Sequence, residues 1–445
     1  MRNRVQLTTV AAFALICCTT VSTVMAAQES GLLELYTLAR EKDPAIGRSE
    51  ARREASKADA EVAVSALLPH IDANAAIRRI RHSVENYGPQ EINGKYIGSN
   101  YGFGLRLPII TPPSYFQITA ASAGVRSADA GNSAVRQELM TRVTDAYVRL
   151  LKVQADERLY RDEMLRVSQV LEQADAFLKA GTGDIIAVYE ARARLDSAAA
   201  DLVKIENQRR LAEQSLSTLA GIPVTGIRDL GQQTPAGPQP AELQWWIDTM
   251  YKNQPNLLQA KEDMTQAEEY SSASKAAHLP TVQASMGYAV DKGSTFLPLV
   301  ETRQWYIGVN VSVPIYSGGE TSARTRRAVA GESERRFMLD EARNQSLQKL
   351  KEAFLNLEYN VTSVGAMRRK LESAELQLNA VKKGREIGTR TAIDLLNSEQ
   401  SYAVSRRDLT SALYDNLLYG LQLKVAAGVA SVEDLSDISN LSTVK

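Results

Sequence analysis

Residues 305–314, with the sequence WYIGVNVSVP, decide the fold. The odd positions of this stretch, from Trp305 to Val313, are aromatic or branched aliphatic, whereas the even positions, which begin with a tyrosine, are polar or small. Such period-two alternation, ended by Pro314, predicts a β-strand with one apolar face. A helical pattern over residues 320–386 follows almost at once. A strand that leads into so long a helix is unusual in a soluble globular domain.

Three other stretches show the same alternation. Together with the first, they predict strands at about residues 70–81, 96–108, 281–291 and 303–315. Runs of good helix formers, with apolar positions in steps of three and four, predict long helices that need partner helices. The expected bounds of these helices are 114–180, 185–220, 320–386 and 391–427. The predicted fold class is therefore mainly α, with long coiled-coil hairpins and a small β part.

The first 26 residues have the features of a secretory signal peptide. Arg2 and Arg4 form a basic segment, an apolar run follows, and Val24-Met25-Ala26 matches a small-x-Ala cleavage pattern. The alternative, an N-terminal membrane helix, is disfavoured because the apolar run is too short. Both cysteines, Cys17 and Cys18, would leave with this segment, so the mature chain is expected to form no disulfide.

The mature chain is expected to be close to neutral. Loss of the two signal-peptide arginines leaves 52 − 2 = 50 basic residues against 52 acidic ones. This balance gives no basic excess for nucleic-acid binding. No apolar run after residue 26 reaches the ~18 residues of a membrane helix. An exported chain of this kind can therefore enter a membrane only as strands of a closed barrel.

Prolines and glycines recur along the chain at a nearly constant separation. The pairs are Pro44 and Pro255 (211 residues apart), Pro69 and Pro280 (211), Pro108 and Pro314 (206), Gly181 and Gly388 (207), and Gly221 and Gly428 (207). The change in separation falls in a loop between paired strands, where length varies easily. The sequence therefore predicts an internal duplication. The expected parts are a signal peptide (1–26), a first repeat (27–224), a linker (225–241), a second repeat (242–430) and a short polar tail (431–445).

Four strands are too few to enclose a pore, because a closed membrane barrel needs at least about eight. The strand edges are therefore expected to pair with other copies of the chain in a cyclic oligomer. Five aromatic residues suit the membrane interface: Tyr101, Phe103, Tyr288, Trp305 and Tyr306. The competing hypothesis is a secreted periplasmic or surface coiled-coil scaffold or adhesin, capped by a small soluble sheet and without pore activity.

Three features carry a resemblance to a known family. They are the duplication, the strand ends LRLPI (105–109) and VSVPIYSGG (311–319), and the segment GTRTAIDLLN (388–397). In these features the chain resembles the TolC-type outer membrane factors, the exit ducts of type I secretion and tripartite efflux systems. The resemblance covers nearly all of the mature chain, and the GTRT-x-x-D segment is its most specific motif.

The resemblance implies a homotrimer in the outer membrane lipid of a Gram-negative bacterium, with each chain contributing four strands to one transmembrane β-barrel. It also implies a periplasmic α-helical tunnel, closed at rest by inward-coiled helices. A periplasmic adaptor (membrane fusion) protein would connect this tunnel to an inner-membrane ABC or proton-driven pump. Cargo stays open between protein and small molecules. The absence of a lipid-anchor cysteine favours, by analogy, the secretion or multipurpose branch.

Gly181, Thr182 and Gly388 would then mark the helix-hairpin turns at the periplasmic mouth, where the adaptor makes contact. A tight turn needs a residue that tolerates positive φ, and glycine supplies it. Ordinary helix capping explains the same glycines, and the two interpretations are compatible.

The resemblance places Asp394 in an acidic constriction of the tunnel. One carboxylate per subunit would form a ring that attracts cations, and mutual repulsion would raise their pKa values. The second acid common in the family is replaced by Asn397. Arg390 and Thr389 match gate-linking positions, although a plain solvated arginine is the alternative for Arg390.

The particular closing bonds of the family do not transfer to this chain. The expected polar partners near the first hairpin are replaced by Ile186 and Ala187, and Arg385 stands where an aromatic residue is common.

No catalytic constellation is found in the sequence. His70, His82 and His278 are isolated, no cluster has metal-ligand spacing, and no phosphate-binding glycine loop is present. The chain is therefore predicted not to be an enzyme and to need no cofactor. The energy for transport would come from its partner.

Overall fold

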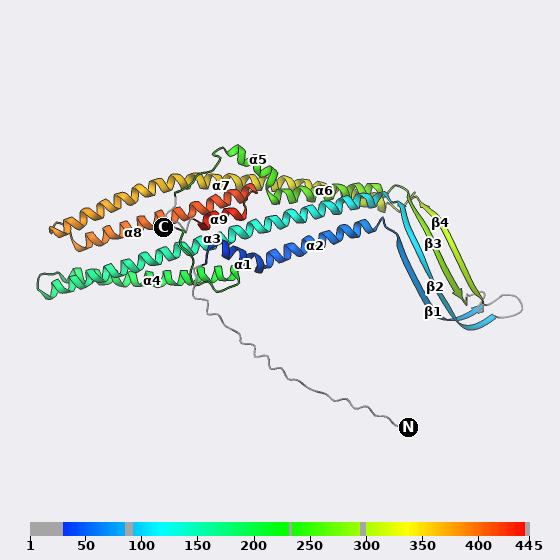
Figure 1. Ribbon diagram of the computed structural model, residues 1–445, viewed down its shortest axis with the longest axis horizontal. Coiled ribbons are helices and arrows are strands. Elements are labelled where there is room, and N and C mark those ends of the chain that lie inside the picture. The colour runs from blue at the N-terminus through cyan, green and yellow to red at the C-terminus, as the bar shows by residue number, and fades with distance from the viewer. Residues whose placement is uncertain (1–29, 85–91, 231–233, 294–299, 441–445) are drawn as a thin grey trace, which may run out of the picture.

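The computed structural model describes residues 30–84, 92–230, 234–293 and 300–440. The expected signal peptide, residues 1–26, lies outside the described residues. The described chain is elongated, with a β-sheet at one end and the turns of two long helical hairpins at the other (Figure 1). Shorter helices lie at the middle of the molecule and along the half of it that leads to the sheet (Figure 1). None of the helices in the described residues combines the length and the apolar character needed to cross a membrane.

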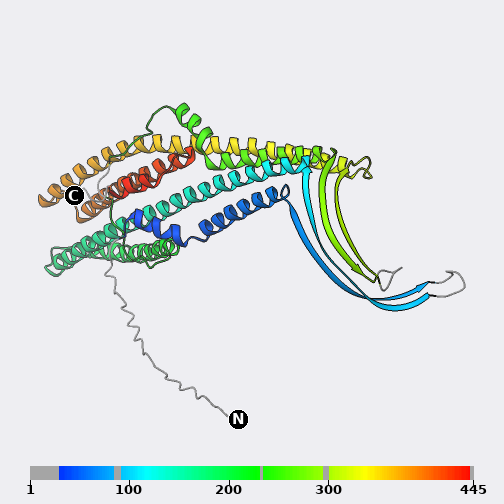
Figure 2. The same ribbon diagram turned by 45° about the vertical axis from the view of Figure 1, so that its right-hand side comes forward.

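The sheet has four antiparallel strands in the order β1-β2-β3-β4. The strands are β1 (His70–Val84), β2 (Ile92–Ile110), β3 (Thr281–Lys292) and β4 (Glu301–Ser312). Strands β1 and β2 extend well past β3 and β4 at the end remote from the helices (Figure 2). β1 and β4 are the edges of the sheet, so their outer hydrogen-bonding groups have no strand partner within the described chain.

Two helical hairpins make up most of the length. The first consists of α3 (Pro112–Lys179) and α4 (Ile185–Ala220), and the second of α7 (Glu320–Glu386) and α8 (Ala392–Ala427). The 68 residues of α3 span about 100 Å at ~1.5 Å per residue. Prolines in the first turn fix where α3 begins, because they lack only N–H groups that a helix start leaves unpaired.

Two shorter helix pairs support the hairpins. They are α1 (Leu32–Lys42) with α2 (Pro44–Ser65), and α5 (Leu243–Asn253) with α6 (Pro255–Ala276). Both pairs bend at a proline. Asp43 Oδ1 accepts a hydrogen bond from the N–H of Ala45 at 2.6 Å, and Gln254 Oε1 accepts one from the N–H of Asn256 at 2.6 Å. The two repeats therefore begin with the same device, a capping side chain followed by proline.

The main hydrophobic core lies at the middle of the molecule, where α1, α3, α4 and α8 meet. Fully buried Leu139, Tyr147 and Leu216 form part of it. The stretch between the repeats, expected to be a linker, contributes Ile227 and Leu230 to this core. It runs across the bundle and is held there, since the hydroxyl of Tyr147 donates a hydrogen bond to the carbonyl of Arg228 at 2.6 Å.

The end of the chain differs from the expected short polar tail. Residues Val432–Asn440 form a helix, α9, with Leu435 and Ile438 buried against the main core. Two apolar residues three positions apart are enough to give a nine-residue helix one buried face. That pattern is too short to stand out from the polar residues around it.

Candidate functional site

Both long hairpins end in the same turn. Gly181 and Gly388 each have φ +76°, the left-handed conformation that favours glycine. After the first glycine, the N–H of Thr182 donates to the carbonyl of Phe177 at 3.0 Å; after the second, the N–H of Thr389 donates to the carbonyl of Gly384 at 2.8 Å. These bonds close helix ends of the Schellman type. The three predicted turn residues therefore lie at the hairpin tips.

The helices that leave the two turns are capped differently. Asp184 caps α4 by accepting a hydrogen bond from the N–H of Ile186 at 2.9 Å. Thr391 and Asp394 cap α8 reciprocally: the N–H of Asp394 donates to Thr391 Oγ1 at 3.1 Å, and the N–H of Thr391 donates to Asp394 Oδ2 at 3.0 Å. This is a capping box, which satisfies two helix-end donors at once.

The capping box favours the ionised form of the Asp394 carboxyl in the single chain. Hydrogen bonds from Thr391, together with the nearby positive charge of Arg390, lower the pKa of the Asp394 carboxyl. The direction is opposite to the upward shift expected for a ring of carboxylates, because that shift requires neighbouring copies. Asn397, one turn further along α8, is exposed.

Arg390 and Thr389 remain on the surface of the turn. The hydroxyl of Thr389 donates to the carbonyl of Gly384 at 2.9 Å, and the Arg390 side chain lies over Gly384. A Cβ built on Gly384 would come within 2.8 Å of Arg390 Cγ. The glycine therefore makes room for the first carbons of Arg390, while its guanidinium lies in the exposed part of the turn.

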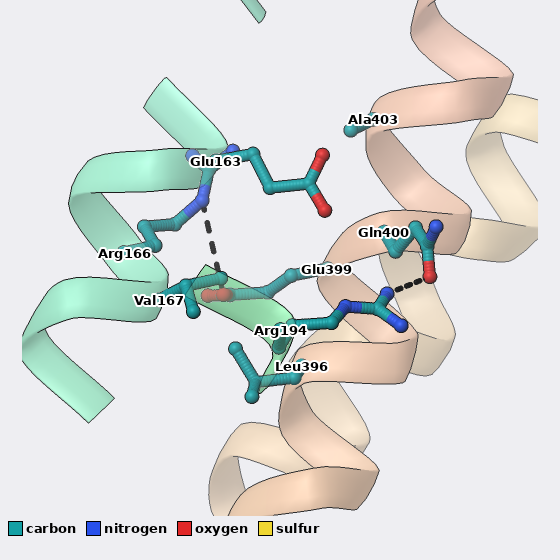
Figure 3. Close-up of a pocket in the computed structure, with 8 residues that line it drawn as sticks. All are labelled: Glu163, Arg166, Val167, Arg194, Leu396, Glu399, Gln400 and Ala403. Carbon is teal, nitrogen blue, oxygen red and sulfur yellow. Dashed lines mark hydrogen bonds and ion pairs between the residues drawn. The ribbon is translucent and has the colours of Figure 1, made fainter. Parts of the chain in front are cut away.

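Near the tips, the two hairpins hold each other through contacts that sequence reasoning missed. The close-up in Figure 3 shows Arg166 of α3 facing Glu399 of α8 (Nε to Oε2, 3.8 Å), and Arg194 of α4 donating a hydrogen bond to Gln400 of α8. Leu396 packs with apolar residues of α3 and α4 on the same side. We call these contacts the hairpin clasp.

A further contact joins the first helix of each hairpin. Arg385 Nη2 of α7 donates a hydrogen bond to Gln173 Oε1 of α3 at 2.6 Å. The resemblance implied an aromatic residue at this position, whereas Arg385 links α7 to α3 in this chain. The sequence signal for this pair is its place near the glycine turns: Gln173 is 181 − 173 = 8 residues before Gly181, and Arg385 is 388 − 385 = 3 residues before Gly388.

The sheet at the opposite end has one apolar and one polar or small face. The register places β1 and β2 residues of odd number on the same face as even residues of β3 and odd residues of β4. Many hydrophobic side chains on this apolar face are exposed. They are Ile71, Ile77, Ile97, Tyr101, Phe103, Leu107, Trp305, Ile307, Val309 and Val311.

Three of the predicted interface aromatics form a row across the apolar face. The ring centroids of Phe103 and Tyr288 are 6.1 Å apart, and those of Tyr288 and Trp305 are 4.6 Å apart. Tyr101 lies on the same face, two residues beyond Phe103. The four residues therefore occupy neighbouring levels of one surface.

Tyr306 lies on the other face of the sheet from these four aromatic residues. Because it follows Trp305 directly, its side chain lies on the opposite face of the sheet. There its ring covers Gly287, where an added Cβ would come within 2.6 Å of the ring. Tyr306 therefore packs over a glycine of the neighbouring strand and is not part of the aromatic row.

Within the described residues, no group of three or more His, Cys, Asp or Glu side chains could hold a metal ion. The arrangement brings together exposed glycine turns, a capped carboxylate and paired polar side chains at one end, and an exposed apolar sheet at the other. Such a chain can bind partners and line a passage; the sites described here supply no nucleophile with its base.

Comparison with known proteins agrees with this architecture. The profile of the family described as "Outer membrane efflux protein" matches residues 35–222 and 246–429, one segment in each repeat. The chain is 27% identical to the outer membrane protein TolC of Vibrio cholerae over 413 residues, which cover 92% of this chain and 93% of TolC. It is 25% identical to the alkaline protease secretion protein AprF of Pseudomonas aeruginosa, over 91% of this chain and 86% of AprF.

A solved structure shares the fold. The CmeC outer membrane channel of Campylobacter jejuni superimposes with a TM-score of 0.79 at 15% sequence identity, over 92% of this chain and 89% of CmeC. A duplicated protomer with a strand pair and a long helical hairpin in each half defines a class of outer membrane channel proteins. This chain belongs to the outer membrane efflux protein family. Its similarity to TolC and AprF supports a channel over the secreted scaffold.

Proposed function

We propose that this protein is the outer membrane channel-tunnel of a tripartite export system, a passive exit duct energised by an inner-membrane partner. The observation that carries the proposal is the sheet: one face of four strands is apolar and exposed, and both edge strands are unpaired within the described chain. A face of this kind is stable in lipid only if its edges are closed by other strands. Three copies would supply 3 × 4 = 12 strands, within the known range of bacterial barrels.

The helical hairpins would continue the same ring into the periplasm as a tunnel. Their first halves carry exposed apolar side chains, such as Phe337 and Val329 of α7, which suit contact with another copy. The homotrimer, the outer membrane location in a Gram-negative bacterium and the absence of catalysis belong to this proposal. The exposed aromatic row of Phe103, Tyr288 and Trp305 would lie at the membrane interface.

The hairpin tips would bind the periplasmic adaptor. Besides Gly181, Thr182 and Gly388, the tips expose Phe177 (57%) and Ile387 (76%). Apolar side chains that are solvated in the single chain at a turn are suited to a partner surface. The adaptor would in turn connect the tunnel to an ABC or proton-driven pump.

The tunnel constriction would be formed next to these tips. Asp394 would supply one carboxylate per copy, with Asn397 as its uncharged neighbour, while Arg390 and Thr389 would contribute to the gate. The hairpin clasp, which pairs Arg166 with Glu399, would hold the two hairpins of one chain together in the resting state. Opening would require these contacts to be exchanged for others or lost.

The cargo class is proposed from the relatives. AprF is named for the secretion of alkaline protease, so we propose type I protein secretion, with small-molecule efflux as the second candidate. Deletion of the gene, followed by assays of exoprotein release and of drug sensitivity, separates the two. Loss of exoprotein release with unchanged drug sensitivity supports secretion.

Planar-bilayer recording tests the channel itself. The purified mature protein is expected to give stepwise conductance, and cross-linking in mild detergent is expected to give trimers. A matched variant, Ile307→Asp on the apolar face, should lose membrane insertion, whereas Asn310→Asp on the opposite face should retain it. A monomeric wild-type protein that extracts in salt and gives no conductance contradicts the proposal.

A further inference from the structure

The apolar face of the sheet ends in cations on all four strands. In the direction away from the helices, the last apolar residue on this face is followed two positions later by lysine or arginine. The pairs are Ile77 and Arg79 on β1, Ile97 and Lys95 on β2, Val290 and Lys292 on β3, and Trp305 and Arg303 on β4. Residues two apart on a strand share a face, so the four cations continue the apolar surface.

The strand register brings cations of neighbouring strands together. Arg79 pairs with Ile97 and Arg81 pairs with Lys95, so β1 and β2 place three positive charges within two levels of the ladder. All three residues are exposed. We call Arg79, Arg81, Lys95 and Lys292 the cation band.

Few acids offset the cation band on its own face. Glu301 lies on that face directly opposite Lys292, and its carboxylate forms an ion pair with Arg303 at 2.7 Å. Asp291 lies on the opposite face, as does Asp72. Among the residues whose side chains the structure describes, no salt bridge joins a carboxylate to Arg79, Arg81, Lys95 or Lys292. Counting the described residues of this face, the band therefore carries a net positive charge, which is concentrated at Arg79, Arg81 and Lys95.

The other end of the apolar face is different. Towards the helices, β2 continues on this face with Leu107 and, after a register shift at Pro108, with Ile110 opposite Val282, and β4 continues with Val309 and Val311. The positive charge is thus confined to the rim remote from the helices. A one-sided band of cations beside an apolar surface matches one leaflet of a bilayer, whose phosphate groups lie just outside the hydrocarbon.

We propose that the cation band binds the phosphate groups of anionic lipids in the outer leaflet of the membrane that holds the sheet. The inference rests on the proposed membrane-embedded barrel. The apolar residues next to the band would contact the lipid chains, and the guanidinium groups of Arg79 and Arg81 would contact phosphate oxygens. Arginine is suited to this contact because its N–H groups match phosphate oxygens in pairs.

Quenching of Trp305 fluorescence by brominated lipid tests the proposal. Trp305 is 67% exposed on the apolar face, two residues from Arg303. Full-length mature protein is reconstituted into phosphatidylcholine vesicles that contain brominated phosphatidylglycerol or, separately, brominated phosphatidylcholine. The signal of Trp305 is isolated by subtracting that of a Trp305→Phe variant, which keeps Trp245 and Trp246. Stronger quenching by phosphatidylglycerol, weakened by added salt, is expected.

A pair of charge-matched variants locates the effect. The double variant Arg79→Gln/Lys95→Gln removes two charges from the band. The preference for phosphatidylglycerol should fall roughly fivefold for each charge that is removed. Arg78→Gln/Arg106→Gln removes two charges from the opposite face of the sheet and should leave the preference unchanged. An equal loss in both variants overturns the proposal, because net charge alone would then explain the preference.

The remaining outcomes separate this proposal from the proposed function. Equal quenching by both brominated lipids overturns lipid selectivity while leaving the membrane-embedded sheet intact. Absence of quenching by either lipid overturns both. Inorganic phosphate is added against chloride of equal ionic strength; if phosphate alone abolishes the preference, the band binds free phosphate and the lipid assignment is wrong.

Discussion

The two repeats are built from the same elements but differ in how fully their long helices are covered. The first half of α3 lies between α2 and α6 and buries Ala120, Ala123 and Asn132. The first half of α7 packs against α6, and no residue of α7 before Ser346 is buried. In the chain, α3 and α6 form the junction between repeats. We therefore expect the equivalent junction of α7 to form with α2 of another copy, just as we expect β4 to pair with another β1.

The largest expected effect breaks this second junction. Phe337 is 73% exposed on the uncovered part of α7, so Phe337→Arg should leave the single chain folded. Between copies, the same change would place an unpaired charge in an apolar contact, which is strongly unfavourable. We expect loss of the trimer, measured by cross-linking and light scattering in detergent, and loss of conductance, with unchanged helix content by circular dichroism.

A second phenylalanine supplies the control. Phe177 is similarly exposed, at 57%, but lies at the tip of the first hairpin. Phe177→Arg should keep the trimer and its conductance and weaken adaptor binding. If Phe337→Arg remains trimeric, the uncovered face of α7 does not contact another copy.

Within the hairpins, equivalent positions are filled by different chemistry. A shift of 388 − 181 = 207 residues relates the two glycine turns. The same shift relates buried Glu157 of α3 to buried Val364 of α7, and Arg209 of α4 to Asn416 of α8. The first hairpin thus has an ion pair, Glu157 Oε2 to Arg209 Nε at 2.8 Å, where the second has an apolar side chain and an amide.

Removal of one member of this pair should cost stability. In Arg209→Leu, buried Glu157 keeps only Arg161 as its partner, so we expect a loss of about 3 kcal/mol, measured by denaturant unfolding of the tunnel helices. The double variant Glu157→Val/Arg209→Leu, which gives the first hairpin apolar side chains at both positions, should recover most of the loss. A single variant as stable as the wild type would mean that Glu157 is solvated in the assembled protein.

The buried amide in the second hairpin has a separate role. The side-chain N–H groups of Asn416 donate to Asn360 at 3.0 Å and to the carbonyl of Ala236 at 3.3 Å, while its oxygen accepts from the N–H of Ala236 at 3.0 Å. The segment that connects the two repeats is therefore held against α8 by this amide.

Local periodicity allowed much of the fold to be predicted from sequence. The alternation around Trp305, the heptad-like spacing and the paired glycines each report on residues that are near in sequence, so strands, long helices and the duplication are visible there. Pairs such as Arg166 and Glu399 lie 399 − 166 = 233 residues apart, and nothing local distinguishes them from solvated side chains. The ion pair of Arg209 with Glu157 was not predictable for the same reason. In the sequence, Arg209 is seen only as a charged residue that interrupts a row of apolar positions.

The candidate site was predicted less completely than the fold. The turn glycines follow from backbone geometry and were predictable. The three-residue spacing of Thr391 and Asp394 is that of a capping box, so the capping role of Asp394 was also predictable from the sequence. Tyr306 shows that an aromatic residue next to another on a strand must lie on the opposite face.

Substitution of the turn glycines should have the same modest effect in both hairpins. Gly181 and Gly388 share φ +76°, and an added Cβ would meet no atom within 4 Å in either turn. Gly181→Ala and Gly388→Ala should therefore each cost only the conformational penalty, about 1 kcal/mol, measured by hydrogen exchange of the turn amides. If one variant loses much more turn stability than the other, and does so only in the assembled protein, the tip that it alters contacts another copy.

The smallest expected effect concerns the two helix caps. The folded-state pKa of Asp394 in the single chain lies below its ordinary value, so its contribution to stability is present above the unfolded-state pKa and is lost as pH falls through the folded value. Repulsion within a carboxylate ring would act in the opposite direction. The pH at which multivalent cations cease to block the channel therefore decides between capping and repulsion. Block should be lost below the ordinary aspartate pKa if capping dominates, and above it if repulsion dominates.

Two substitutions at the second tip and one at the first isolate the charge. Asp394→Asn retains an oxygen that can cap α8 but removes the carboxylate, and should weaken block about fivefold. Asn397→Asp adds a second carboxylate one turn away and should strengthen it. Asp184→Asn makes the same change at the N-cap of α4 and should leave block unchanged. If Asp184→Asn weakens cation block as much as Asp394→Asn does, both tips line the constriction. The two caps would then differ only in their hydrogen-bond geometry and not in their effect on block.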